Sequence, residues 1–218
     1  MVMGRTLLKV CGVISPFEAE EISKYADMLG VVIDPASKRC VGNDVVGKVV
    51  GASEKDVFLV STSTDLAMWE NVLSETRARC VQIHNETVSH DTVDALASRC
   101  DSVMVAFKVP CFSTDPIAEA EGICENIERI APDMVLLDTG AGCGVVHDHR
   151  VSALISSRYD IMLAGGITQL NAAAALDATS PKGLDVSSGV EGRDGRKDIG
   201  RVAGMRIIID DHGSEGRG

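Results

Sequence analysis

The sequence predicts a single-domain α/β protein folded as a (β/α)8 TIM barrel, and three observations support this fold class. Short apolar strands alternate with amphipathic helices along the whole chain, giving eight strand–helix units. The strand ends recur every roughly 22 to 30 residues, which is the spacing expected of such a barrel. No Pro-, Gly- or Ser-rich linker divides the 218 residues. Aromatic residues make up only 3%, so Val, Ile, Leu and Ala must fill the layers around a parallel sheet.

The first half of the chain begins with a clear helix start. Ser15 is an N-cap residue, Pro16 suits the first helical position, and Glu18 completes a capping box. Apolar residues spaced by three and four then predict a helix over Phe17–Leu29, with Leu29 on its inner face. The other elements expected here are strands at 7–10, 30–33, 56–61 and 80–84, and helices at 44–50, near 66–73 and near 93–97.

The second half repeats the pattern. Asp115 and Pro116 mark another helix start, and the inner face of that helix is expected to carry Ile117, Cys124, Ile127 and Ile130. The remaining strands are expected at 102–108, 134–138, 161–164 and 183–186, and the remaining helices near 151–156, at 169–176 and at 198–209. We therefore expect one barrel over residues 1–210 and a polar tail over 211–218.

Charge and cysteine usage limit the possible partners. The net charge of −11 argues against a nucleic-acid or anionic-membrane surface, and an anionic ligand would need locally aimed donors such as helix N-termini. The seven cysteines occur singly, with no CxxC pair, which favours a reduced cytoplasmic protein and no zinc site. No apolar run approaches the length of a membrane span.

The residues at the predicted strand ends suggest chemistry, because the active face of a barrel lies at the C-terminal ends of its strands. Cys11 supplies a thiol and Asp138 a carboxyl group, and together they offer a base and an acid on opposite sides of one pocket. Proton shuttling within a sugar needs such a pair. The full series of strand ends is Cys11, Asp34, Thr62, His84, Lys108, Asp138, Gly165-Gly166 and Ser187-Ser188-Gly189.

The last two strand ends predict a phosphate site. Small residues there leave backbone N–H groups uncovered and directed at one spot, and the loops after strands seven and eight of a barrel commonly hold phosphate in this way. Two tight turns would also explain the glycines, but both clusters on adjacent strands favour a phosphate site. The residues expected to hold the phosphate are Gly165, Gly166, Ser187, Ser188 and Gly189.

Two further positions, His84 and Arg39, allow two interpretations each, and one cluster of histidines superficially resembles a metal site. His84 is either a ligand-contacting imidazole or a hydrogen-bonded structural one. Arg39 could hold a substrate carboxylate through its planar fork or be a solvated loop residue. His147 and His149 flank Asp148 but lack a third ligand pair, so we expect no metal site.

Several segments resemble one enzyme family. They are Lys9-Val10-Cys11-Gly12, Ala26-Asp27-Met28-Leu29-Gly30, Ser37-Lys38-Arg39, Val81-Gln82-Ile83-His84, Leu163-Ala164-Gly165-Gly166-Ile167 followed by Asn171, and Asp185-Val186-Ser187-Ser188-Gly189-Val190-Glu191 followed by Gly195-x-Lys197-Asp198. In this order, over nearly the whole chain, they resemble the phosphoribosylanthranilate isomerase family of tryptophan biosynthesis.

The resemblance implies an isomerase that performs the Amadori rearrangement of N-(5-phosphoribosyl)anthranilate without a cofactor. Asp138 would protonate the furanose ring oxygen, and Cys11, as thiolate, would remove the proton from C2 of the sugar. Arg39 would orient the anthranilate carboxylate, while the glycines and serines of the last two loops would hold the phosphate. The expected partner is a small phosphosugar carrying an anthranilate group, and the expected assembly is a monomer or a homodimer.

The chain departs from the family after the proposed acid. Relatives carry Gly-Gly-Thr-Gly-x-x-Phe-Asp-Trp, whereas this chain has Ala141-Gly142-Cys143-Gly144-Val145-Val146-His147-Asp148-His149. The threonine and both aromatic residues are thus absent. His84 is also followed by Asn85, where relatives usually have glycine.

Two other functions remain open from the sequence. One is a different phosphosugar enzyme: an epimerase with a metal and a pair of aspartates on different strands, or an aldolase with a Schiff-base lysine, for which Lys108 is the best-placed residue. The other is a non-catalytic barrel that binds phosphosugars, a possibility raised by the altered loop at 141–149.

Overall fold

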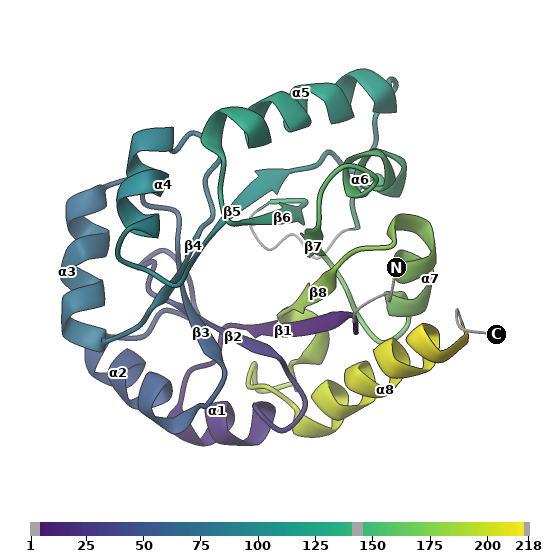
Figure 1. Cartoon of the computed structure of the whole chain (residues 1–218). Coiled ribbons are helices and arrows are strands. Elements are labelled where there is room, and N and C mark those ends of the chain that lie inside the picture. The colour runs from purple at the N-terminus through teal and green to yellow at the C-terminus, as the bar shows by residue number, and fades with distance from the viewer. Residues whose placement is uncertain (1–4, 141–145, 216–218) are drawn as a thin grey trace.

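The computed structural model describes residues 5–140 and 146–215, and within this part of the chain eight parallel strands close into a barrel in sequence order (Figure 1). Each strand pairs with its sequence neighbours, and β1 also pairs with β8. The strands are β1 Leu7–Cys11, β2 Met28–Val32, β3 Asp56–Ser61, β4 Cys80–Ile83, β5 Ser102–Lys108, β6 Met134–Asp138, β7 Ile161–Leu163 and β8 Gly183–Val186. The predicted fold class is confirmed.

Helices surround the ring of strands (Figure 1). They are α1 Pro16–Ile22, α2 Asn43–Ala52, α3 Leu66–Thr76, α4 His90–Ala97, α5 Pro116–Ile130, α6 His149–Ser156, α7 Ala172–Thr179 and α8 Ile199–Glu215, together with a short 3-10 helix, η1, at Ser188–Val190. No helix in the described ranges is both long and apolar enough to cross a membrane.

The predicted cap of α1 forms as expected. The hydroxyl of Ser15 accepts a hydrogen bond from the Glu18 N–H at 3.2 Å. The Glu18 carboxylate in turn accepts one from the Ile14 N–H at 2.9 Å. Two otherwise unsatisfied donors are thereby paired, which fixes the turn that follows β1 and its terminal Cys11.

Three features of the helices differ most from the prediction. Helix α1 ends at Ile22 and does not reach Leu29. Leu29 instead belongs to β2, where it pairs with Val10 of β1. Its burial alone could not distinguish helix from strand, since a short apolar run fits both. Ile117 lies in the first turn of α5 and is 62% exposed, because the buried face of that helix starts one turn later at Ala120. Helix α7 spans 172–179 rather than 169–176.

The end of the chain also differs from the expected tail. Helix α8 continues to Glu215 and so includes residues 211–215 of the segment 211–218 that we expected to be a polar tail. Residues 216–218 lie outside the described ranges. Although the segment is polar, it continues the helical hydrogen bonding that begins at Ile199.

Two apolar layers support the barrel. The larger fills the space between the strands and the helices, and it includes Leu8 and Val10 of β1. A smaller cluster, including Phe58, Met104 and Met162, fills the barrel interior. Because side chains alternate along a strand, Lys9 and Cys11 point to the inside whereas Leu8 and Val10 point outward. The apolar filling leaves a cavity at the C-terminal ends of the strands.

Candidate active site

The candidate active site is a cavity of about 450 Å³ at the C-terminal ends of the strands. It brings together residues that are widely separated in the sequence, which is what a closed barrel does with its strand ends. Of the predicted site residues, the cavity is lined by Cys11, Arg39, His84, Asp138, Gly165, Gly166, Ser187 and Ser188. Gly189 is not in the lining.

Cys11 ends β1, and its side chain is partly exposed to the cavity. The Ser187 hydroxyl donates a hydrogen bond to the Cys11 carbonyl at 2.9 Å, which ties the end of β1 to the loop after β8. Burial raises the pKa of the thiol, and this effect outweighs the opposing positive charge of the nearby Lys9. The free protein therefore holds Cys11 as a neutral thiol at pH 7.

Asp138 ends β6, and its pKa is shifted in the opposite direction to that of Cys11. One carboxylate oxygen accepts the Thr139 N–H at 2.8 Å, and the other lies 3.1 Å from His84 Nε2. Burial acts to raise the pKa of Asp138, but the His84 hydrogen bond and charge, with the Thr139 N–H, hold it below its usual value. Asp138 is therefore a carboxylate in the free protein. His84 lines the cavity and is bound to Asp138, and its contact with a ligand stays a prediction.

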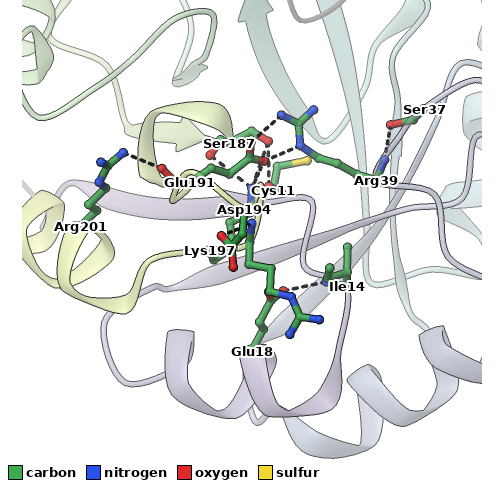
Figure 2. Close-up of polar contacts among 11 residues, drawn as sticks. Cys11, Ile14, Glu18, Ser37, Arg39, Ser187, Glu191, Asp194, Lys197 and Arg201 are labelled. Atoms are coloured by element: carbon green, nitrogen blue, oxygen red, sulfur yellow. Dashed lines mark hydrogen bonds and ion pairs between the residues drawn. The ribbon is translucent and has the colours of Figure 1, made fainter.

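Arg39 reaches the cavity from the loop after β2 and is held by an acidic residue (Figure 2). Its Nε and Nη2 donate to Glu191 Oε1 and Oε2 at 2.6 and 3.1 Å. Lys197, whose side chain is almost fully buried, also donates to Glu191 Oε1, at 3.0 Å. Although burial acts to raise the pKa of Glu191, the two cations lower it to about 2. The position of the Arg39 fork is thus fixed before any ligand binds.

The sequence did not assign roles to Glu191 or Lys197, although both occur in a segment that carries the family resemblance. Their contacts join residues far apart in the chain: Arg39 and Glu191 are separated by 152 positions. The available signal was a pair of charged residues, Glu191 and Lys197, in a glycine-containing segment that follows a predicted strand end. The sequence alone could not show which residues they bind.

The loops after β7 and β8, where the phosphate site is predicted, contain backbone donors that are not used within the described part of the chain. Gly165 and Gly166 have φ angles of +84° and +66°, which glycine adopts readily. Within the described ranges, the N–H groups of Gly165, Gly166, Ser188 and Gly189 donate to no backbone or side-chain acceptor. The Ser187 hydroxyl is already engaged by Cys11 and Lys197. The loops therefore offer four amides, rather than hydroxyls alone, to an anion.

Gly189 packs closely against the loop after β7. A Cβ at this position would overlap the carbonyl oxygen of Ile167, so the η1 turn can approach the loop after β7 only with glycine there. We expect Gly189→Ala to push the two loops apart and to raise the KM for a phosphorylated substrate about tenfold or more. Steady-state kinetics with Gly51→Ala as control checks this, because a Cβ at Gly51 in α2 meets no atom within 4 Å. An unchanged KM in Gly189→Ala would contradict the assignment.

Lys108 lies outside this cavity. It is exposed at the end of β5, and its N–H donates to Glu86 in a shallow depression beside α5. The cavity that holds Cys11 and Asp138 is therefore not built around a lysine at that strand end, which removes the observation that pointed to a Schiff-base aldolase.

The loop that departs from the family is described only in part. Residues 141–145 lie outside the described ranges. Asp148 caps α6 and binds Arg150, whereas the rings of His147 and His149 lie edge to face with centroids 5.4 Å apart. Among the described residues, no group of three or more His, Cys, Asp or Glu side chains is placed to hold a metal ion. Asp148 thus supports the loop structurally.

Comparison with known proteins agrees with this geometry. The family model described as N-(5'phosphoribosyl)anthranilate (PRA) isomerase matches residues 8–205. The N-(5'-phosphoribosyl)anthranilate isomerase of Thermococcus kodakarensis is 41% identical over 203 residues, which cover 93% of this chain and 97% of that protein. The same enzyme of Methanococcus vannielii is 39% identical over 89% of this chain and 93% of its own length.

A solved structure extends the agreement to three dimensions. The N-(5'-phosphoribosyl)anthranilate isomerase of Pyrococcus furiosus superposes with a TM-score of 0.88 at 34% identity, and the match covers 94% of this chain and 99% of that one. The family match spans the barrel from β1 into α8, including the strand ends that line the cavity. The chain therefore belongs to the N-(5'-phosphoribosyl)anthranilate isomerase family, enzymes of tryptophan biosynthesis.

Proposed function

We propose that this chain converts N-(5-phosphoribosyl)anthranilate to 1-(o-carboxyphenylamino)-1-deoxyribulose 5-phosphate by an Amadori rearrangement in which its own side chains move the protons. The observation that carries the proposal is the shared cavity of Cys11 and Asp138, whose lining includes three residues with free amides, Gly165, Gly166 and Ser188, next to the fourth, Gly189. Acid and base groups must flank the sugar for this reaction, while the amides suit its phosphate.

The reaction is assigned to two groups. Asp138 in its protonated form gives its proton to the furanose ring oxygen as the C1–O bond breaks, which leaves a Schiff base between C1 and the anthranilate nitrogen. Cys11 as thiolate then takes the proton from C2, and the C–H electrons form the C1–C2 double bond of the enolamine. Tautomerisation of the enolamine, with loss of the C2 hydroxyl proton and gain of a proton at C1, gives the ketone.

Two interactions hold the substrate in this arrangement. The N–H groups of Gly165, Gly166, Ser188 and Gly189 donate hydrogen bonds to the phosphate oxygens. Arg39 takes the anthranilate carboxylate with the edge of its guanidinium that Glu191 leaves open, since Glu191 occupies only the Nε–Nη2 edge.

The protonation states of Cys11 and Asp138 in the free protein predict how kcat/KM depends on pH. Burial raises the thiol pKa of Cys11 above its ordinary 9.0, whereas His84 and the Thr139 N–H lower that of Asp138 below 3.8. The resting state thus has the proton on sulfur, and the reactive state has the same number of protons with one on Asp138. Between the two pKa values, the fraction of protein molecules in this reactive state does not change with pH.

We therefore expect kcat/KM to be nearly constant from about pH 7 to about pH 8.5, where the substrate phosphate is fully ionised. Above the Cys11 pKa, kcat/KM should fall because the acid is then unprotonated. A pH–rate profile with a steep increase between pH 7 and 8.5 would contradict this placement of the proton, because it would indicate a simple thiol base with an acid already protonated.

A turnover assay tests the function itself. Consumption of N-(5-phosphoribosyl)anthranilate is followed by loss of its fluorescence, and the product is identified by mass and by its ketone. Binding of the substrate with no turnover would favour the non-catalytic barrel. An epimerase with a metal between paired aspartates is disfavoured by the contacts of the other two aspartates that line the cavity. Asp185 is bound by the Lys9 ammonium at 2.8 Å, and Asp34 accepts hydrogen bonds from the N–H groups of Ala36 and Thr62.

A further inference from the structure

A buried ion pair lies directly below the thiol on the inner wall of the barrel. Lys9 of β1 and Asp185 of β8 are partners in the strand register, and Lys9 Nζ donates to Asp185 Oδ2 at 2.8 Å. Lys9 is fully buried and Asp185 is 6% exposed. A Cβ added at Gly30 would lie 3.0 Å from Cys11 Sγ and 3.1 Å from Lys9 Nζ, so the ammonium is close to the sulfur.

The pair leaves one acceptor unused. Asp185 Oδ1 is buried and has no hydrogen-bond partner among the described residues, yet Asp185 is part of the cavity lining. An unpaired buried carboxylate oxygen is costly, and native structures pair nearly all such groups. Since the unpaired oxygen belongs to a side chain that faces the substrate cavity, a donor on the ligand is the fitting partner.

The position of Asp185 selects which donor this is. Cys11 lies two residues beyond Lys9 on the same face of β1, so the thiol and the Asp185 carboxylate are neighbours on the inner wall. The proposed function requires Cys11 to reach the hydrogen on C2 of the sugar. The C2 hydroxyl is bonded to that same carbon, and it is therefore the substrate donor nearest to Asp185.

We propose that Asp185 is a substrate-binding residue whose Oδ1 accepts a hydrogen bond from the sugar C2 hydroxyl, which turns the C2–H bond toward Cys11. This inference rests on the proposed function and adds a specificity determinant to it. Lys9 holds the carboxylate in place through Oδ2 and balances its charge. Sugar phosphates without a C2 hydroxyl would leave Oδ1 unpaired and would bind more weakly.

Binding measurements test this separately from turnover. The probes are the reduced form of the product, in which C2 carries a hydroxyl, and its 2-deoxy and 3-deoxy analogues, titrated calorimetrically. For the wild-type protein, removal of the C2 hydroxyl should weaken binding about 10- to 100-fold, as for a hydrogen bond to a charged group. In Asp185→Ala, which has no side-chain acceptor, the same removal should cost less than about threefold, while the 3-deoxy analogue should behave alike in both proteins.

Folding is controlled within the same experiment. Asp185→Ala leaves the Lys9 ammonium without its partner, so Lys9→Met combined with Asp185→Ala provides a variant without a buried unpaired ammonium, and circular dichroism reports its folding. The role of Asp185 would be overturned if removal of the C2 hydroxyl lowered the affinity equally in wild type and variant, or did not lower it in wild type. Either result would leave the proposed function intact. Failure of the wild-type protein to bind the reduced product would overturn both.

Discussion

Replacement of Cys11 by alanine is expected to lower kcat by about 10²- to 10⁴-fold, which is the contribution of a positioned general base. KM should change little, because the amides of the last two loops and Arg39 do not depend on the sulfur. Cys11 is a half-buried residue in the cavity wall, so the fold should tolerate the change. The assay is loss of substrate fluorescence under saturating substrate.

Cys40→Ala is the matched control, because Cys40 is an exposed thiol outside the cavity. It should retain wild-type activity. A second variant, Cys11→Ser, keeps the shape but replaces the thiol with a far weaker acid and should be almost as impaired as Cys11→Ala. Wild-type kcat in Cys11→Ala would remove the base from the mechanism.

Asp138→Asn is the second change with a large expected effect. The amide keeps the volume of the side chain and can still be hydrogen-bonded by the Thr139 N–H, but it cannot deliver a proton to the ring oxygen. We expect a fall in kcat of about 10²- to 10⁴-fold, since ring opening then depends on water. The pH plateau described above should also disappear, because its acidic partner is gone.

Asp65→Asn serves as the control for Asp138→Asn. Asp65 caps α3 on the same rim of the barrel, accepts a hydrogen bond from the Ala67 N–H and does not line the cavity. Asparagine is also a good N-cap, so stability and activity should both be retained. If Asp138→Asn were as active as Asp65→Asn, the acid would have to be another group, and His84 would be the first to test.

Much of the fold could be predicted because its signals are local. Ser15, Pro16 and Glu18 define the start of α1 within four positions, and the strand 134–138 was recognisable as an apolar run that ends in a carboxylate. The error at Leu29 has a physical reason. Burial was correct there, but the partner that makes the segment a strand, Val10 of β1, lies elsewhere in the sequence.

The sequence was enough to predict which strand ends form the candidate site, but not which ion pairs form within it. Strand ends converge in any barrel, so Cys11 and Asp138 could be placed in one cavity from their positions alone. The pairing of Arg39 with Glu191 and of Lys9 with Asp185 could not, because each joins residues more than 150 positions apart. These contacts set the pKa values and leave the free acceptor on which the further inference rests.

A crystal structure of the protein with the reduced product tests the central claim most directly. We expect the phosphate to lie on the amides of Gly165, Gly166, Ser188 and Gly189, with C2 next to Cys11 Sγ and the sugar oxygen released by ring opening next to Asp138. A phosphate at these amides with C2 turned away from Cys11, or a phosphate bound elsewhere, would contradict the account.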